Sequence, residues 1–264
     1  MLAVISPAKS LDFSPAPAGV PRTVPERLED SAELIAALRK LSARQIARLM
    51  DLSEKLAALN HERYHAWTTD FPAAQKEGRA KQALLAFNGD VYQGFALEEY
   101  TRADFTHAQK HLRILSGLHG VLRPLDLIQP YRLEMGRPLK TKRGKDLYAF
   151  WGSRITTALN DALAAAKAKA LVNLASEEYF ASVQPHQLNA PAVQCVFKDE
   201  KNGTFKIISF FAKKARGLMA DFIIRERVKT IAELKDFSAA GYAFDAASSS
   251  ENSLVFLRRE KAAC

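Results

Sequence analysis

Short apolar runs alternate along the chain with longer stretches in which apolar residues recur every three or four positions. The mainly apolar runs at 2–5, 111–115 and 170–174 are typical of buried strands. Helical spacing covers 29–67, 104–110, 147–168 and 210–228. Within the first of these stretches Ser42 and Ser53 stand where helices would begin, because a serine hydroxyl accepts a free backbone N–H of the first turn.

Two pairs of short runs predict β-hairpins. Residues 194–197 and 204–208 flank Asn202 and Gly203, and residues 242–244 and 254–256 flank a serine-rich turn. Strands and helices otherwise alternate, with no repeat and no linker. We therefore expect a single α/β (α+β) domain over residues 1–264, with a mixed central sheet flanked by helices.

Composition supports a folded globular protein. The 264 residues are 48% hydrophobic and 25% charged, which excludes a disordered or low-complexity chain. No run approaches the ~18 apolar residues of a membrane span, and the first residues lack the basic start of a signal peptide. Cys195 and Cys264 are too few for a disulfide framework. We expect a cytoplasmic protein with no membrane partner.

Positive charge is concentrated in two segments. The net charge is +9, with +7 between residues 102 and 145 and +5 between residues 198 and 229. If the two segments fold against each other they form a basic cleft, which attracts polyanions such as the phosphates of DNA. An anionic metabolite is a second interpretation, and a solvated surface that keeps the protein in solution is a third.

Two histidine pairs have metal-ligand spacing. His61 to His65 reads HERYH, a formal match to the HExxH zinc motif, but no third ligand stands in a supporting motif. His107 and His111 share the spacing, and we expect His111 to lie beyond the end of its helix. Glycine-rich nucleotide loops and the GxSxG motif are absent from the sequence. We therefore predict no metal and no cofactor.

Two further positions have two interpretations each. Gly117 and Gly120 form a turn between Arg113 and Arg123, which is either a nest of backbone N–H groups for an anion or an ordinary tight turn. Ser176 follows a buried strand, where it either meets a ligand at the carboxyl end of the sheet or caps the next helix.

Six blocks of sequence together resemble the YaaA family of bacterial peroxide stress proteins. They span nearly the whole chain: ISPAKSLD at 5–12, FNGDVY at 87–92, LSGLHGVLRPLD at 115–126, PYRLEMG at 130–136, NLAS at 173–176 and KKARG at 213–217. The resemblance implies a cytosolic protein that protects against hydrogen peroxide and has the family's own α/β fold, called the cantaloupe fold. It also implies DNA binding through a basic cleft and a helix-hairpin-helix, and limitation of iron-driven damage.

The helix-hairpin-helix is not located by the sequence. Gly117 and Gly120 are separated by two residues, whereas that motif has glycines one residue apart. Pro124 would also interrupt the start of a second helix.

The first functional hypothesis is non-sequence-specific DNA binding. Tyr131 and Trp151 would stack on unpaired bases. The groups expected to contact phosphates or another anion are Arg113, Gly117, Gly120, Arg123, Arg132, Lys140, Lys142, Arg143, Lys213, Lys214 and Arg216.

The alternative is an enzyme that acts on an anionic small molecule or nucleotide in the same cleft. The blocks also hold polar residues of many kinds, which suit a catalytic pocket better than a groove for a phosphate backbone. The candidate catalytic residues are Lys9, Glu134, Ser176 and Tyr179. We expect Lys9, Glu134 and Tyr179 to converge with Lys213 and Arg216 near the carboxyl ends of the strands.

Overall fold

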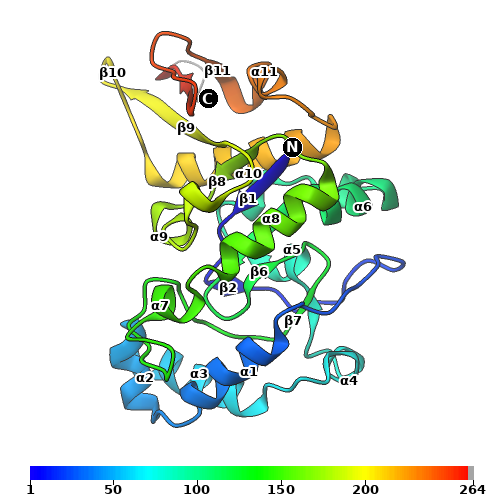
Figure 1. The fold of residues 1–264 in the computed structure, drawn as a ribbon, viewed down its shortest axis with the longest axis vertical. Helices are drawn as coiled ribbons and strands as arrows, with labels where there is room; N and C mark the ends of the chain where they lie inside the picture. Colours follow the sequence, from blue (N-terminus) through cyan, green and yellow to red (C-terminus); the bar gives the residue numbers. More distant parts are fainter. Residues whose placement is uncertain (261–264) are drawn as a thin grey trace.

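A computed structural model describes residues 1–260, which fold around an eight-stranded sheet (Figure 1). Across the sheet the order is β11 (Tyr242–Phe244), β12 (Ser253–Arg258), β9 (Ala192–Lys201), β8 (Leu171–Leu174), β1 (Leu2–Ile5), β5 (Leu112–Ser116) and β6 (Gly120–Leu122), and β10 (Thr204–Lys206) pairs with β9. The strands from β12 to β5 run parallel. The other three pairs are antiparallel, so the predicted mixed α/β class is confirmed.

The centre of the sheet follows from the apolar runs. All four residues of β1 are buried between β8 and β5, which explains why the run has no polar face. The predicted strands at 2–5 and 170–174 are confirmed, and so are both hairpins, as the pairs β9–β10 and β11–β12. Two smaller sheets pair β2 (Ser10–Leu11) with β4 (Phe87–Asn88) and β3 (Lys81–Gln82) with β7 (Leu127–Ile128).

Helices surround the sheet and extend the molecule at one end. Their bounds are α1 (Leu28–Leu38), α2 (Ala43–Met50), α3 (Glu54–Ala66), α4 (Phe71–Lys76), α5 (Ala83–Ala86), α6 (Arg102–His111), α7 (Leu147–Trp151), α8 (Arg154–Ala166), α9 (Glu177–Phe180), α10 (Ser209–Arg225) and α11 (Ile231–Leu234), with 3-10 turns at Tyr92–Gly94 (η1), Leu97–Glu99 (η2), Pro185–Gln187 (η3) and Ala239–Gly241 (η4). Helices α8 and α10 both contact β1. The group α1, α2, α3 and α7 lies at the lower end of Figure 1, away from the large sheet.

The predicted helix starts in the N-terminal region are confirmed. Ser42 caps α2 by accepting the backbone N–H of Gln45, and the Gln45 side chain accepts the N–H of Ser42 in return. Ser53 caps α3 by accepting the N–H of Leu56. These caps divide the helical pattern of 29–67 into separate helices.

Two helix boundaries differ from the prediction. The single helix expected over 147–168 is wrong, because Gly152 has a φ of 51° and separates α7 from α8. His111 was expected beyond the helix end, but it is the last residue of α6. Its side chain therefore lies one helical turn after that of His107, on the same face.

The glycine turn is a buried part of the β5–β6 hairpin. A Cβ at Gly117 would lie 2.2 Å from the carbonyl oxygen of Leu133, and Gly120 has a φ of 68° against the Trp151 ring. Strands flank the turn on both sides, so it is not a helix-hairpin-helix. Trp151 is fully buried and donates its indole N–H to the carbonyl of Gly117, 2.9 Å away, so the predicted base stacking by Trp151 is wrong.

The buried apolar side chains form one continuous core, which includes Cys195. Cys264 lies outside the described residues. Among residues 1–260, no helix is both long enough and apolar enough to cross a membrane.

Candidate functional site

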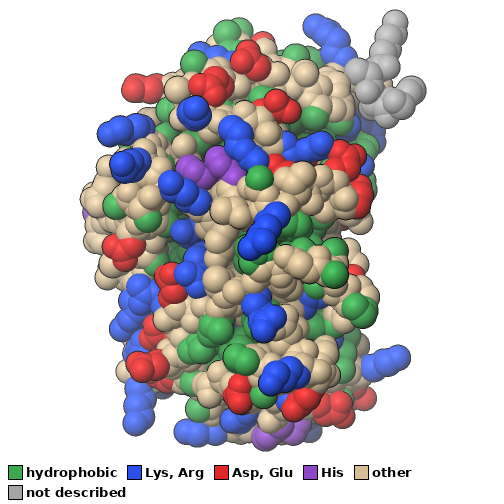
Figure 2. All heavy atoms as spheres, turned by 90° about the vertical axis from the view of Figure 1, so that its right-hand side faces the viewer, with side chains coloured by type: hydrophobic (Ala, Val, Ile, Leu, Met, Phe, Trp, Pro, Cys, Tyr) green, Lys and Arg blue, Asp and Glu red, His purple; other side chains and the backbone are tan. Residues whose placement is uncertain are grey.

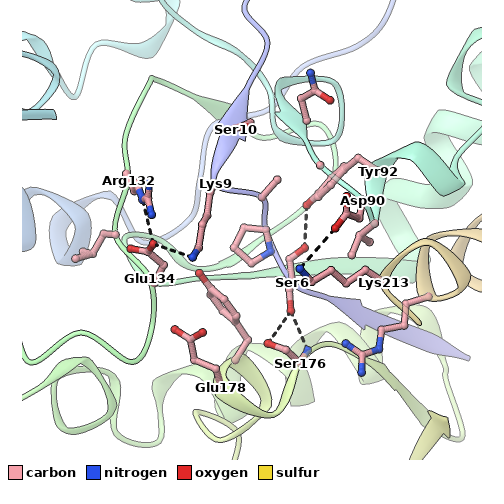
Figure 3. Close-up of a pocket in the computed structure, with 18 of the residues that line it drawn as sticks. Ser6, Lys9, Ser10, Asp90, Tyr92, Arg132, Glu134, Ser176, Glu178 and Lys213 are labelled. Carbon is pink, nitrogen blue, oxygen red and sulfur yellow. Dashed lines mark hydrogen bonds and ion pairs between the residues drawn. The ribbon is translucent and has the colours of Figure 1, made fainter. Parts of the chain in front are cut away.

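A pocket of about 440 Å³ opens where the parallel strands β1 and β8 end (Figure 3). We call it the central pocket. It is lined by Ser6, Pro7, Ala8, Lys9, Ser10, Asn88, Gly89, Asp90, Val91, Tyr92, Tyr131, Arg132, Leu133, Glu134, Ser176, Glu178, Tyr179, Lys213 and Arg216. Adjacent parallel strands place the segments that follow them at one edge of the sheet, which is where ligands bind in α/β folds.

Two serines join the ends of β1 and β8. The backbone N–H of Ser176 donates to Ser6 Oγ at 2.9 Å, and Ser6 Oγ donates to Ser176 Oγ at 3.3 Å. Tyr92 donates its hydroxyl to the carbonyl of Ser6 at 3.1 Å. The Ser176 side chain does not cap α9, so of its two interpretations the structure supports the position in the pocket.

Glu134 is a buried carboxylate surrounded by cations. Arg132 donates Nε–H to Oε1 at 3.0 Å, Lys9 Nζ lies 3.8 Å from Oε1, and Arg137 Nε lies 3.7 Å from Oε2. The residue is 4% exposed, and among the described residues Oε2 has no hydrogen-bond partner. A buried acceptor without a hydrogen bond is costly, so Oε2 marks a place where a ligand can donate one.

Helix α10 contributes two cations to another part of the pocket wall. Lys213 Nζ lies 3.5 Å from Asp90 Oδ2, and Lys213 is half exposed. Arg216 forms no ion pair within residues 1–260, and its burial lowers the pKa of the guanidinium. Glu177 acts on the guanidinium only from beyond ion-pair distance. A partly buried guanidinium that forms no ion pair is suited to hold an anion.

A glycine contact fixes the position of this part of α10. A Cβ at Gly217 would lie 1.8 Å from the carbonyl oxygen of Val91, and one at Gly94 would lie 2.4 Å from the backbone N of Leu218. The backbones of α10 and η1 therefore touch, which sets Lys213 next to Asp90.

Buried tyrosines complete the lining. Burial raises the pKa of Tyr131 and Tyr179, so both hydroxyls keep their protons at neutral pH. Tyr131 is hydrogen-bonded to Ser116 Oγ at 2.7 Å and is 5% exposed, a position unsuited to the open stacking on bases that we predicted. Tyr179 lines the pocket as a neutral hydroxyl, which can donate a hydrogen bond.

The structure brings together the side chains that we expected to converge. Lys9, Glu134, Tyr179, Lys213 and Arg216 all line the central pocket. One part of the wall carries cations for an anionic group, and another carries a carboxylate with an oxygen that accepts no hydrogen bond within the described residues. Such a pocket can hold a phosphate-bearing molecule and exchange a proton with it.

Three other predicted cations already have partners away from the pocket. Arg113 is buried and donates to the carbonyls of Gln109 and Leu112. Arg123 forms ion pairs with Asp126 at 2.7 Å and with Glu26 at 2.8 Å.

Arg143 forms ion pairs with Asp30 and Glu33 and lies over the Phe150 ring. By contrast, Lys140, Lys142 and Lys214 are exposed and form no ion pair within the described residues. The predicted cations therefore divide into paired, exposed and pocket-lining groups.

Three residues near Glu134 and Ser176 escaped sequence reasoning. Ser6 follows β1 as Ser176 follows β8, so the rule that selected Ser176 also selects Ser6. Glu178 accepts the backbone N–H of Gly136 at 2.9 Å. Arg137 reaches Glu134 from three residues further along, which only the fold of this loop reveals.

The HERYH segment lies on α3, where the rings of His61 and His65 are 4.5 Å apart between centroids. Residues 1–260 contain no group of three or more His, Cys, Asp or Glu side chains placed to hold a metal ion.

Comparison with known proteins gives a match over nearly the whole chain. The profile of the family described as "Peroxide stress protein YaaA" matches residues 1–248. A UPF0246 protein of Paraburkholderia xenovorans is 55% identical over 261 residues, which is 98% of this chain and 99% of that protein. UPF0246 proteins of Burkholderia lata and Burkholderia vietnamiensis are each 56% identical over 262 residues, with the same coverage.

Proposed function

The chain belongs to the peroxide stress protein YaaA family, and on that premise we propose that it protects its cell against hydrogen peroxide through the central pocket. In this proposal the pocket binds a phosphate-bearing small molecule of nucleotide size and carries out acid–base chemistry on it. A volume of about 440 Å³ lies within the range of small-molecule sites.

One observation carries the proposal: Glu134 Oε2 is buried and accepts no hydrogen bond within the described residues. A surface that bound only phosphates would need cations alone. A buried carboxylate on such a surface would repel the phosphates. This carboxylate lies among Lys9, Arg132 and Arg137, yet its Oε2, 3.7 Å from Arg137 Nε, accepts no hydrogen bond within the described residues. The arrangement supports a ligand that carries a donor group as well as an anionic group.

Each side chain then has a role. Lys213 and Arg216 hold the anionic group, and Glu134 Oε2 accepts a hydrogen bond or a proton from the ligand. Tyr179 donates from its neutral hydroxyl, because burial raises its pKa. Ser6 and Ser176 position the ligand between them as paired hydroxyls at the ends of β1 and β8.

Glu134→Gln tests this assignment, because glutamine keeps the oxygen that Arg132 contacts and replaces the free oxygen by an amide. We expect inorganic phosphate to bind roughly threefold more tightly, since one negative charge leaves the pocket. Nucleoside monophosphates that donate to Oε2 should bind about tenfold more weakly. Isothermal titration calorimetry with inorganic phosphate and the four common ribonucleoside monophosphates measures both changes.

Glu178→Gln is the matched control, because Glu178 also lines the pocket but is exposed and accepts a backbone N–H. It should leave the preference between phosphate and nucleotide unchanged. Equal effects of the two substitutions, or no effect of either, would contradict the role of Glu134.

DNA binding is the second candidate, and the exposed lysines favour it. Lys214 follows Lys213 on α10, and Lys140 and Lys142 lie on an exposed loop. Exposed cations bind phosphates without reading sequence, so Lys214→Ala should weaken binding to DNA and reduce its salt dependence. Fluorescence anisotropy with a labelled duplex at two salt concentrations measures this, and an unchanged salt slope would contradict it.

Limitation of iron-driven damage would follow from the same contacts. Lysines that neutralise DNA phosphates release the cations condensed on them, and in this proposal ferrous ions are displaced in the same way. We also propose that residues 1–264 form one domain with the family's cantaloupe fold, which the single continuous core supports.

A further inference from the structure

A second hollow, which shares no lining residue with the central pocket, is built around the two histidines of α6. It has a volume of about 580 Å³ and is lined by Arg102, Ala103, Thr106, His107, Lys110, His111 and Arg227. We call it the histidine hollow. Figure 2 shows histidine side chains among Lys and Arg side chains on this face of the molecule.

The two imidazoles lie against each other. Their ring centroids are 4.2 Å apart with an interplanar angle of 25°. His111 Nδ1 lies 2.8 Å from the carbonyl oxygen of Met1, which can only accept, so Nδ1 carries the hydrogen. This bond to the residue before β1 fixes the orientation of the His111 ring and leaves its Nε2 as the other polar atom.

Every charged side chain that lines the hollow is positive. Arg102 and Lys110 are exposed on α6, and Arg227 reaches in from beyond the end of α10. Asp104 stands beside the hollow, but it forms an ion pair with Arg227 at 2.6 Å and accepts bonds from Thr101.

Charges on neighbouring elements add to the positive field. The amino group of Met1, which precedes β1, and the guanidinium of Arg113 on β5 both act on His111. Glu233 of α11 offsets part of the effect of the amino group. The histidine hollow is therefore a basic recess with two titratable rings in it.

The histidines are neutral at physiological pH. Burial lowers the pKa of His107 to about 4, with smaller contributions from His111 and Arg227. Burial also lowers the pKa of His111, although its bond to Met1 acts in the opposite direction. A bound anion would reverse the local field and raise both pKa values, so anion binding and protonation favour each other.

We propose that the histidine hollow is a second anion site, which binds a phosphate-type group and takes up protons on its imidazoles as it does so. Two imidazoles four residues apart also suit a divalent metal ion, but no carboxylate lines the hollow within the described residues and its cations would repel a metal. Charge therefore favours the anion.

Sulfate is the first probe, because it stays a dianion across the pH range and any pH dependence then belongs to the protein. Titration calorimetry of the full chain at pH 5.5, 6.5 and 7.5 should show affinity rising at least about threefold from pH 7.5 to 5.5. His107→Gln/His111→Gln should remove this pH dependence. Inorganic phosphate and AMP, titrated alongside, distinguish a free anion from a nucleotide phosphate.

The cations are tested separately. Arg102→Ala/Lys110→Ala should lower sulfate affinity about tenfold, whereas Arg44→Ala/Lys55→Ala, which removes exposed cations from α2 and α3, should not. Each titration is repeated in a Lys213→Ala/Arg216→Ala background, in which the central pocket lacks its two anion-binding cations. The result for the histidine hollow then does not depend on whether the central pocket binds an anion.

Three results would overturn the proposal. They are no sulfate binding at pH 5.5 in that background, an affinity that does not change with pH, and Zn²⁺ binding that needs both imidazoles while sulfate does not bind.

Discussion

Removal of Lys213 and Arg216 together is expected to lower the affinity of the protein for inorganic phosphate and nucleotides by about 100-fold, since two charge-assisted hydrogen bonds are lost. Arg216 should account for most of the loss, because it is half-buried without an ion pair in the described chain, whereas Lys213 is half exposed beside Asp90. Titration calorimetry of Lys213→Ala/Arg216→Ala against the wild type measures the change.

Stability should not fall in the same variant. Arg216 is partly buried and forms no ion pair within the described residues, and the ion pair of Lys213 with Asp90 is half exposed. Both side chains therefore contribute little to folding, and the melting temperature should stay the same or rise. Lys206→Ala/Lys214→Ala is the matched control, since it also removes two cations near α10 but neither residue lines the pocket. Equal losses of phosphate affinity in the two double variants would show that general surface charge, and not the pocket, holds the anion.

Gly217→Ala is expected to destabilise the protein by about 3 kcal/mol or more. The new Cβ would lie 1.8 Å from the carbonyl oxygen of Val91, and backbone atoms on both sides must move to accommodate it. For a chain of this size the loss corresponds to a fall in melting temperature of roughly 6 °C. The shift of α10 should also weaken phosphate binding, because Arg216 precedes Gly217 in the helix.

Gly78→Ala provides the comparison for this substitution. Nothing lies within 4 Å of a Cβ at Gly78, but its φ of 72° makes alanine unfavourable by about 1 kcal/mol. Comparing the melting temperatures of the two variants then separates the effect of the close contact between α10 and η1 from the effect of backbone strain at a positive φ. A melting temperature for Gly217→Ala no lower than that of Gly78→Ala would contradict the close contact between α10 and η1.

The architecture was predictable where one pattern decided the local structure. The apolar run of β1, the caps at Ser42 and Ser53 and the Asn202–Gly203 turn each needed only neighbouring residues. The prediction of one helix over 147–168 was wrong, because alanine and leucine continue the helical pattern on both sides of Gly152. The conformation of Gly152 depends on its surroundings in the fold.

The site was predictable in its residues but not in their pairing. Five of the six family-like blocks contribute to the central pocket, so polar variety within them was a useful signal. The ion pairs of Arg123 with Glu26 and of Arg143 with Asp30 were not predictable, because the partners lie about a hundred positions apart in sequence. The number of cations in a segment therefore overestimated those free to contact a phosphate.

The block at 115–126 does not line the central pocket but packs against the loop that does. Its Gly117 packs against the carbonyl of Leu133, the residue before Glu134. This close contact helps to fix the position of the loop that carries the Glu134 carboxylate. A glycine that allows close packing and a glycine whose backbone N–H binds an anion cannot be told apart from the sequence.

Survival in hydrogen peroxide tests the central claim most directly. Cells lacking this protein would be complemented with the wild type, with Lys213→Ala/Arg216→Ala or with Lys206→Ala/Lys214→Ala, at matched protein levels. The central pocket predicts that the wild type and the lysine variant restore survival, whereas the pocket variant does not. Full restoration by the pocket variant would contradict the proposal that protection depends on this pocket.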